Sequence, residues 1–318
     1  MATDESRYDA AMREIARIAG ELVGNYTSPP NGAENPDDFD SAAGCRIMPL
    51  PDRLQEKAAE MAARINPTNA PLWELLGAGD GGPDRPLWLT LTTSKYWGPK
   101  PKTLSVSFME PAPADLRARI VSHLNAWSQS CGISFAQTSG TGDVRISRGS
   151  GGYWSYLGTD IRLIPSNRQT MNLQGFTMNT QESEYLRVIR HEAGHTLGFP
   201  HEHMRKALVE RIDPQKAYAY FLRTQGWSKE MVDRQVLTPL DARSIIGTEP
   251  DQDSIMCYQL PGEITKDGQP IRGGTDINQS DAAFAGLIYP KALWTAETEM
   301  ATARVVNWDP ADDVRVAT

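Results

Sequence analysis

Histidine is concentrated in one short stretch of this chain. Four of the five histidines fall within the thirteen residues from His191 to His203, in the sequence HEAGHTLGFPHEHMR. His191 and His195 are four residues apart, so on a helix their side chains lie on one face, one turn apart. Two imidazoles placed in this way can bind one metal ion. Glu192 lies at the edge of that face, where it can act as a general base on a water beside the metal.

The residues that follow predict a third ligand. Gly198 can take the left-handed conformation that ends a helix, and Pro200 prevents the helix from resuming. The chain then turns, which brings His201 back to the same ion. Three neutral imidazoles leave a fourth position for water, as in a catalytic zinc site and unlike a closed structural one. His203 is one histidine more than this spacing needs, and we expect it outside the ligand set.

Composition and charge narrow the classes of function. The 318 residues carry a formal net charge of -8, which argues against nucleic acid as the main partner. No apolar run approaches the roughly 20 residues of a membrane span. The N-terminus lacks the basic and apolar regions of a secretory signal, so we expect export by another route or an internal location. The three cysteines are too few for a disulfide framework.

Three regions differ in composition. We expect an N-terminal helical and loop region over 1–84, which would be a prosegment or an accessory region, a catalytic region over 85–291 and a short tail over 292–318. The catalytic region alternates strand and helix patterns up to about 198, with strands in LWLTLTT, TLSVSF, ISFAQT, DVRIS and GGYWSYLGTD, and helices from Pro113 and from about Asn179. From 199 to 291 helix patterns dominate, over Pro214–Thr224, Ser228–Gln235 and Ser280–Ile288. In the N-terminal region, helices are expected over Ser6–Val23 and between Pro51 and Pro67, with loops over Thr27–Gly44 and 77–86.

The extended histidine motif and a later methionine segment together resemble the metzincin zinc proteases. The resemblance is closest to the astacin family, whose motif continues as HExxHxxGFxHE; Phe199, His201 and Glu202 stand where that motif requires them. The segment SIMCY, from Ser254, looks like the family's SIMHY, with Cys257 in place of a histidine. WSYLG and QSDAAFAGLIYP are also similar to family segments. The similarity extends over roughly 85–290.

The resemblance implies a fold and a role for each matching residue. The fold would be α+β, with a twisted mixed sheet and two long helices in an upper subdomain, a mainly helical lower subdomain, and the active cleft between them. One zinc ion would be bound by His191, His195 and His201, with Glu192 as general base and acid. Met256 would form an apolar floor, Tyr258 would be a switchable ligand that stabilises the oxyanion, and Glu202 would anchor the lower subdomain.

The substrate implied by the resemblance is an extended protein or peptide chain. It would pair with the edge strand at Trp154, Ser155, Tyr156 and Leu157 through main-chain hydrogen bonds. We expect a monomer with no nucleic-acid partner. The sequence therefore predicts a zinc endopeptidase. The alternatives are a latent or inactive zinc-containing peptide-binding module and a protease selective for a single partner protein.

Cys45 is the only cysteine of the N-terminal region. A thiolate is a good zinc ligand and could occupy the water position, which would hold the enzyme latent. The alternative is a free cysteine that only packs.

Overall fold

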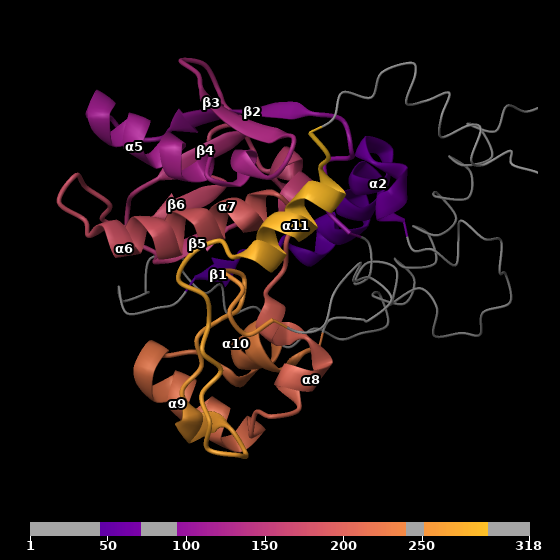
Figure 1. Cartoon of the computed structure of the whole chain (residues 1–318), viewed down its shortest axis with the longest axis vertical. Helices are drawn as coiled ribbons and strands as arrows, with labels where there is room; N and C mark the ends of the chain where they lie inside the picture. Colours follow the sequence, from indigo (N-terminus) through magenta and orange to yellow (C-terminus); the bar gives the residue numbers. More distant parts are fainter. Residues whose placement is uncertain (1–44, 71–93, 240–250, 292–318) are drawn as a thin grey trace, which may run out of the picture.

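The computed structural model describes residues 45–70, 94–239 and 251–291 (Figure 1). The predicted helix over Ser6–Val23, the loop over Thr27–Gly44, the link at 77–86, the strand LWLTLTT and the tail lie outside these residues. Within the described part of the chain, no helix has the length and apolar character of a membrane span.

A six-stranded mixed sheet forms the upper part of the molecule. Its strands are β1 (Arg46–Ile47), β2 (Lys102–Phe108), β3 (Ile133–Gln137), β4 (Val144–Ser147), β5 (Tyr153–Ser155) and β6 (Met171–Leu173). They lie in the order β1-β5-β6-β4-β2-β3. Every neighbouring pair is parallel except β5 and β6. The strands β2 to β5 follow the sequence prediction, whereas β1 and β6 were not predicted.

Two helices pack together against the sheet (Figure 1). The first is α5 (Ala114–Leu124), where the prediction placed it. The second begins as α6 (Glu182–Glu184), continues through a π-helical turn at Tyr185–Ile189 and ends as α7 (Arg190–Thr196). It starts slightly later than predicted, and its N-cap, Gln181, makes no side-chain capping bond. The helix α11 (Gln279–Ile288) begins with a capping box formed by Asn278 and Asp281.

The lower part of the molecule is helical, with α8 (Lys206–Val209), α9 (Pro214–Gln225) and α10 (Lys229–Val232) below the sheet in Figure 1. The α9 helix has Pro214 in its first turn, and the Asp213 side chain accepts hydrogen bonds from two backbone amides there. It ends at Gly226, whose φ is 66°. A π-helical turn over Asp233–Leu237 extends α10. Short 3-10 turns cover Asp52–Leu54, Pro67–Asn69, Trp127–Gln129, Gly158–Leu163, Glu202–Met204 and Gly262–Ile264.

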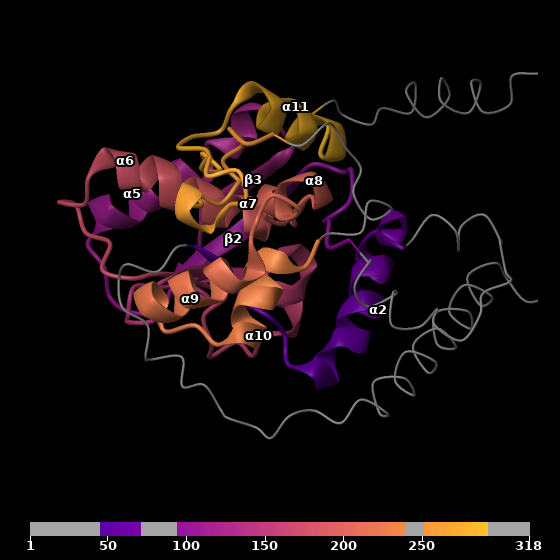
Figure 2. The same cartoon turned by 90° about the horizontal axis from the view of Figure 1, so that it is seen from below.

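The described part of the N-terminal region lies on the upper subdomain. The strand β1 adds to the sheet, and α2 (Gln55–Ile65), the predicted second helix, packs against the turn at Gly158–Leu163. Figure 2, seen from below, shows α2 along one side of the described part of the molecule. The buried Asn69 side chain donates to the carbonyls of Ala62 and Tyr96 and accepts from the Tyr96 amide. This polar contact joins 45–70 to the chain that enters the catalytic region.

The described residues form two hydrophobic cores. The larger one joins the sheet to α5, α7 and α11, and it includes Trp127, Tyr185 and Met256. The smaller one joins α9 and α10 to the segment from Cys257 to Ile271. The site described next lies where these two cores meet.

Candidate metal centre and catalytic site

The active-site helix presents His191 and His195 and then stops at a glycine. Gly198 has a φ of 96°, a conformation that strongly favours glycine. A Cβ at this position would also lie 2.9 Å from the Lys95 carbonyl oxygen. The Phe199 amide donates to the Gly194 carbonyl, which closes the turn. This turn is what returns His201 to the helix.

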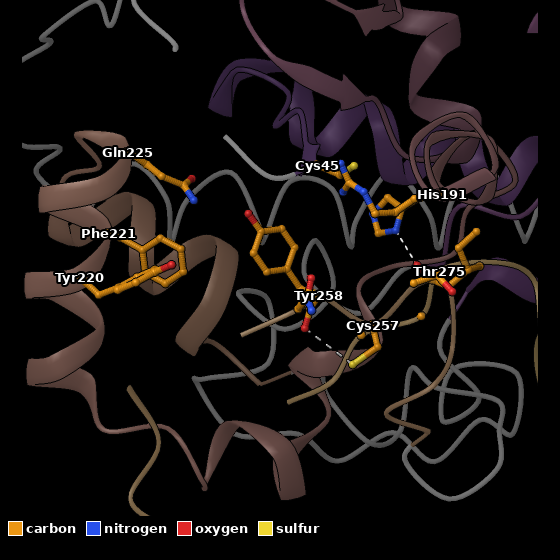
Figure 3. Close-up of a pocket in the computed structure, with 13 residues that line it drawn as sticks. Cys45, His191, Tyr220, Phe221, Gln225, Cys257, Tyr258 and Thr275 are labelled. Carbon is orange, nitrogen blue, oxygen red and sulfur yellow. Dashed lines mark hydrogen bonds between the residues drawn. The ribbon is translucent and has the colours of Figure 1, made fainter. Parts of the chain in front are cut away.

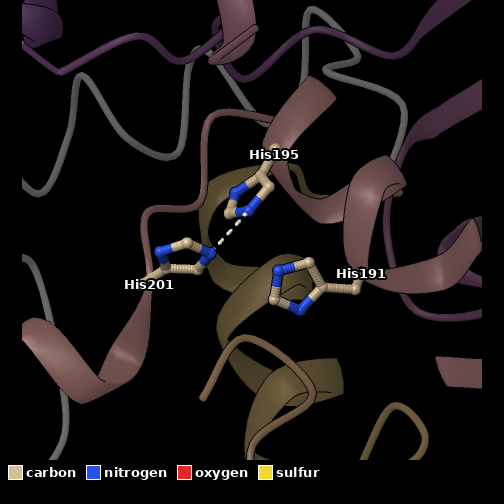
Figure 4. A group of neighbouring side chains, drawn as sticks. All are labelled: His191, His195 and His201. Atoms are coloured by element: carbon tan, nitrogen blue, oxygen red, sulfur yellow. Dashed lines mark hydrogen bonds between the residues drawn. The ribbon is translucent and has the colours of Figure 1, made fainter. Parts of the chain in front are cut away.

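The structure brings the three predicted ligands together (Figure 4). Each of His191, His195 and His201 offers one ring nitrogen, and these atoms lie within 4.8 Å of one another. The Nδ1 atoms of His191 and His195 are 2.6 Å and 2.8 Å from the carbonyls of Ile255 and Phe199. Because a carbonyl only accepts, each Nδ1 carries the proton and each Nε2 keeps its lone pair for a metal.

Burial keeps these imidazoles in the neutral form that a metal requires. It lowers the pKa of His191 to about 4, and it lowers the pKa of His195 and His201 in the same direction. The His191 Nε2 atom is buried and has no hydrogen-bond partner among the described residues. The His195 and His201 Nε2 atoms face each other at 3.1 Å. Three neutral nitrogen donors converging on one buried point fit zinc.

Glu192 is buried beside the histidines, and desolvation raises the pKa of its carboxyl group. A carboxyl group whose pKa is raised in this way is better suited to take and return a proton than a solvated one. Its carboxylate lies in a second group with the ligand atoms of Cys45 and His191, and its role as general base stays a prediction.

The methionine segment lies directly beneath the active-site helix. Met256 packs so closely against Gly194 that a Cβ there would lie 2.3 Å from the Met256 Sδ. Asp281, on α11, holds this segment by accepting from Ser254 Oγ at 2.5 Å and from the Ile255 amide at 2.9 Å. The Ile255 carbonyl in turn fixes His191. Asp281 therefore supports a ligand through the backbone, and it was not singled out in the sequence.

Glu202 links the turn after His201 to the methionine segment. Its amide donates to the Met256 carbonyl at 2.8 Å. Its carboxylate pairs with Arg205 at 3.0 Å and accepts from the Asp251 amide at 3.3 Å. These contacts tie the start of the lower subdomain to the site.

Tyr258 lines, together with His191, a cavity of about 210 Å³ (Figure 3). Its ring contacts those of His201 and His203, with centroid separations of 5.6 Å and 5.4 Å. Its buried hydroxyl faces the Gln225 amide, and burial raises its pKa, so the hydroxyl stays protonated and can donate. His203 is buried behind these rings and is not among the three converging histidines.

Cys45 occupies the same site. Its sulfur and the ligand atoms of His191 and Glu192 lie within 4.8 Å of one another, and all three residues are buried. Figure 3 places Cys45 beside His191 at the top of the cavity. Burial raises the pKa of the thiol, with the nearby Glu192 carboxylate contributing in the same direction.

The predicted edge strand is covered in this structure. Arg46 pairs with Trp154 and Ile47 with Ser155 in parallel register, so β1 takes the edge position that we expected β5 to hold. Trp154 and Ser155 belong to β5, whereas Tyr156 and Leu157 follow it. The segment expected to bind substrate is therefore bound to residues that follow Cys45.

Cys131 and Cys257 are buried free cysteines, as is Cys45. Burial raises the pKa of Cys257 to about 12, with Glu202 and Asp251 contributing, which makes it an unreactive packing residue.

Comparison with known proteins agrees with this geometry. The family model described as Astacin (Peptidase family M12A) matches residues 90–262, which is more than half of the chain. No curated protein matches the chain significantly.

Solved structures are also similar to this chain. A structure of myroilysin is 30% identical, with a TM-score of 0.59, and the alignment covers 64% of this chain and 99% of that one. A second myroilysin structure gives a TM-score of 0.49 at 30% identity, over 62% and 86% of the two chains. The hatching enzyme HCE-1, a zinc-protease from Oryzias latipes (medaka fish), is 19% identical with a TM-score of 0.41, over 59% and 88%.

The family model extends over the histidine motif, the methionine segment and the strands β2 to β6. The fold is accordingly α+β, and the histidine group is the zinc site that the family's peptidases use. Proteins or peptides are the substrates that this activity implies. The chain belongs to the astacin family of zinc metalloendopeptidases, peptidase family M12A.

Proposed function

We propose that this chain is a latent zinc endopeptidase in which Cys45 and the strand that follows it close the site. The observation that carries the proposal is the position of Cys45. Its sulfur lies in one group with the ligand atoms of His191 and Glu192, and the next two residues are paired to β5. One short segment therefore covers both the metal face and the strand expected to bind substrate.

In the open enzyme, His191, His195 and His201 would hold zinc, which supplies a Lewis acid that polarises the substrate carbonyl. Glu192 would take a proton from the attacking water and return it to the leaving amine. The raised pKa of this buried carboxyl group supports both transfers. Tyr258 would donate its hydroxyl to the developing oxyanion, and Met256 would support the histidines from below.

In the latent form, the Cys45 thiolate would be the fourth zinc ligand. Sulfur is among the ligands that zinc prefers, and a closed set of four protein ligands leaves no place for water. The buried side chain of Arg46, which donates to the Gly151 carbonyl at 3.0 Å, holds the segment next to the thiol. Latency of this kind would end when the segment leaves the cleft.

The proposal gives each region of the chain a role. Residues 1–84 would be an inhibitory prosegment, 85–291 the catalytic domain with subdomains 85–198 and 199–291, and 292–318 a tail. The described residues of one chain supply every group that this mechanism uses, so the proposal is of an enzyme that acts as a monomer.

Cleavage of an unfolded protein by zinc-loaded, full-length chains tests the proposal. We expect Cys45→Ser to cleave at least about tenfold faster than the wild type, because serine is a poor substitute for a thiolate ligand. Cys131→Ser, which removes another buried thiol, should match the wild type. Equal rates for the wild type and Cys45→Ser would refute latency. A Cys45→Ser chain that binds peptide without cleaving it would refute the peptidase assignment.

A further inference from the structure

The peptide group between Ile47 and Met48 is held from both sides. Its N–H, on Met48, donates to the Ser155 carbonyl of the upper subdomain at 2.9 Å. Its C=O, on Ile47, accepts from Nε2 of Gln235 in the lower subdomain at 3.1 Å. In a sheet, a second strand would supply that donor. Here the side chain of Gln235 supplies it.

Gln235 is built into the wall of the cleft. It lies within the π-helical turn Asp233–Leu237, and only 6% of its surface is exposed. Its own carbonyl accepts from Nε2 of the buried His203 at 3.0 Å. π-Helical turns are found often at functional sites, where they change the direction of a side chain. This turn places the Gln235 amide within hydrogen-bonding distance of Ile47 on β1. Figure 1 shows β1, an edge strand of the sheet, on the side of the lower helices.

Release of residues 45–48 leaves these two groups in need of new partners. The Ser155 carbonyl is a strand acceptor, and the Gln235 Nε2 is a largely buried donor that is unfavourable to leave unsatisfied. In an extended peptide, the C=O and the N–H of each peptide group point to opposite sides of the chain. It therefore satisfies both groups, whichever way it runs.

We propose that Gln235 is a substrate-binding residue, which forms the lower side of the cleft by donating to a main-chain carbonyl of an extended peptide. The inference rests on the proposed function, because it takes the position of residues 46–48 as the position of substrate. The ligand class is a polypeptide main chain. The hydrogen bond from Gln235 involves only the main chain of the peptide, so it contributes to affinity whatever the peptide's sequence.

The test must separate the substrate from the tethered segment, because Gln235 binds Ile47 in the same way. We would use the full-length chain with two substitutions in the segment. Cys45→Ser removes the thiol, and Met48→Pro removes the N–H that donates to the Ser155 carbonyl. Glu192→Gln is added so that bound peptide is not cleaved. Hydrogen exchange at residues 46 and 47 establishes that the segment has left the cleft before any affinity is compared.

The measurement is the Kd of a fluorescent decapeptide for this zinc-loaded chain, with and without Gln235→Leu. We expect Gln235→Leu to raise Kd about tenfold, the loss of one main-chain hydrogen bond at a buried donor. Gln235→Glu, which keeps the length of the side chain but cannot donate, should raise Kd at least as much. Gln215→Leu, an exposed glutamine of the same subdomain, should leave Kd unchanged.

An unchanged Kd in both Gln235 variants, with melting temperatures equal to that of the parent chain, would overturn the inference. This result is distinct from failure of the proposed function. The peptidase assignment fails when the Cys45→Ser chain with intact Glu192 binds peptide and does not cleave it. The Kd comparison is unaffected by that outcome.

Discussion

Met256 and Cys257 are consecutive in the chain, yet their side chains belong to different hydrophobic cores. Met256 packs in the upper core with the sheet and the active-site helix, and Cys257 packs in the lower core with α9 and α10. The backbone crosses from one subdomain to the other at this peptide bond. The histidines lie at that crossing, so the packing of the methionine segment determines where both halves of the cleft meet.

Replacing Gly194 with alanine tests this packing. The added Cβ would lie 2.3 Å from the Met256 Sδ and 3.2 Å from Trp127 Cζ2, so the methionine must move. We expect a loss of about 1–3 kcal/mol in the free energy of unfolding, measured by urea denaturation. In a Met256→Ala chain, Gly194→Ala should lower the free energy of unfolding by at least about 1 kcal/mol less than it does in the wild type. Identical costs in the two backgrounds would contradict the contact.

Asp281→Asn tests the anchor of the methionine segment. The carboxylate accepts hydrogen bonds from Ser254 Oγ and from the amides of Ile255 and Asn278, and an amide cannot accept all of them. We expect a loss of about 2–3 kcal/mol in stability and weaker zinc retention during dialysis against a chelator.

The matched control for this variant is Asp253→Asn. The Asp253 side chain is 59% exposed and pairs with the exposed Arg272. Its replacement should change stability by no more than about 0.5 kcal/mol. Similar losses in Asp281→Asn and Asp253→Asn would show that Asp281 has no special role.

Glu192→Gln separates metal binding from proton transfer. The variant keeps the shape of the side chain and removes its basicity, so the three histidines should bind zinc as before. In the Cys45→Ser background we expect kcat to fall by about 10²–10⁴-fold with one zinc retained per chain, measured by metal analysis beside peptide cleavage. Turnover close to that of the parent chain would exclude Glu192 as the general base.

Tyr258→Phe removes the proposed oxyanion donor and keeps the ring that packs against His201 and His203. In the Cys45→Ser background we expect a fall in kcat of about 10²–10³-fold with little change in KM, because the contact forms in the transition state. Tyr220→Phe, which removes a hydroxyl from the same cavity, serves as control. A rise in KM alone would assign Tyr258 to substrate binding.

The ligand set could be predicted from the sequence because its signals are local. The spacing of His191 and His195 fixes one helix face, and Gly198 fixes the turn that returns His201. The helices α5 and α9 were predictable for the same reason, since each carries its own periodicity and a proline at its start.

The features that were missed depend on contacts between distant residues. The strand β1 has two residues and is defined only by pairing with β5, so no periodicity marks it. Gln235 and Asp281 look like ordinary helical polar residues until the fold places Ile47 and Ile255 beside them. Cys45 could be proposed as a ligand from its chemistry, but its position beside His191 needed the structure.

The coordination of zinc in the full-length chain tests the central claim most directly. X-ray absorption of the zinc-loaded wild type should give three nitrogen ligands at about 2.0–2.1 Å and one sulfur ligand at about 2.3 Å. The sulfur should vanish in Cys45→Ser and persist in Cys257→Ser. A wild-type zinc site with nitrogen and oxygen ligands alone would contradict latency by Cys45, and a chain that binds no zinc would contradict the account as a whole.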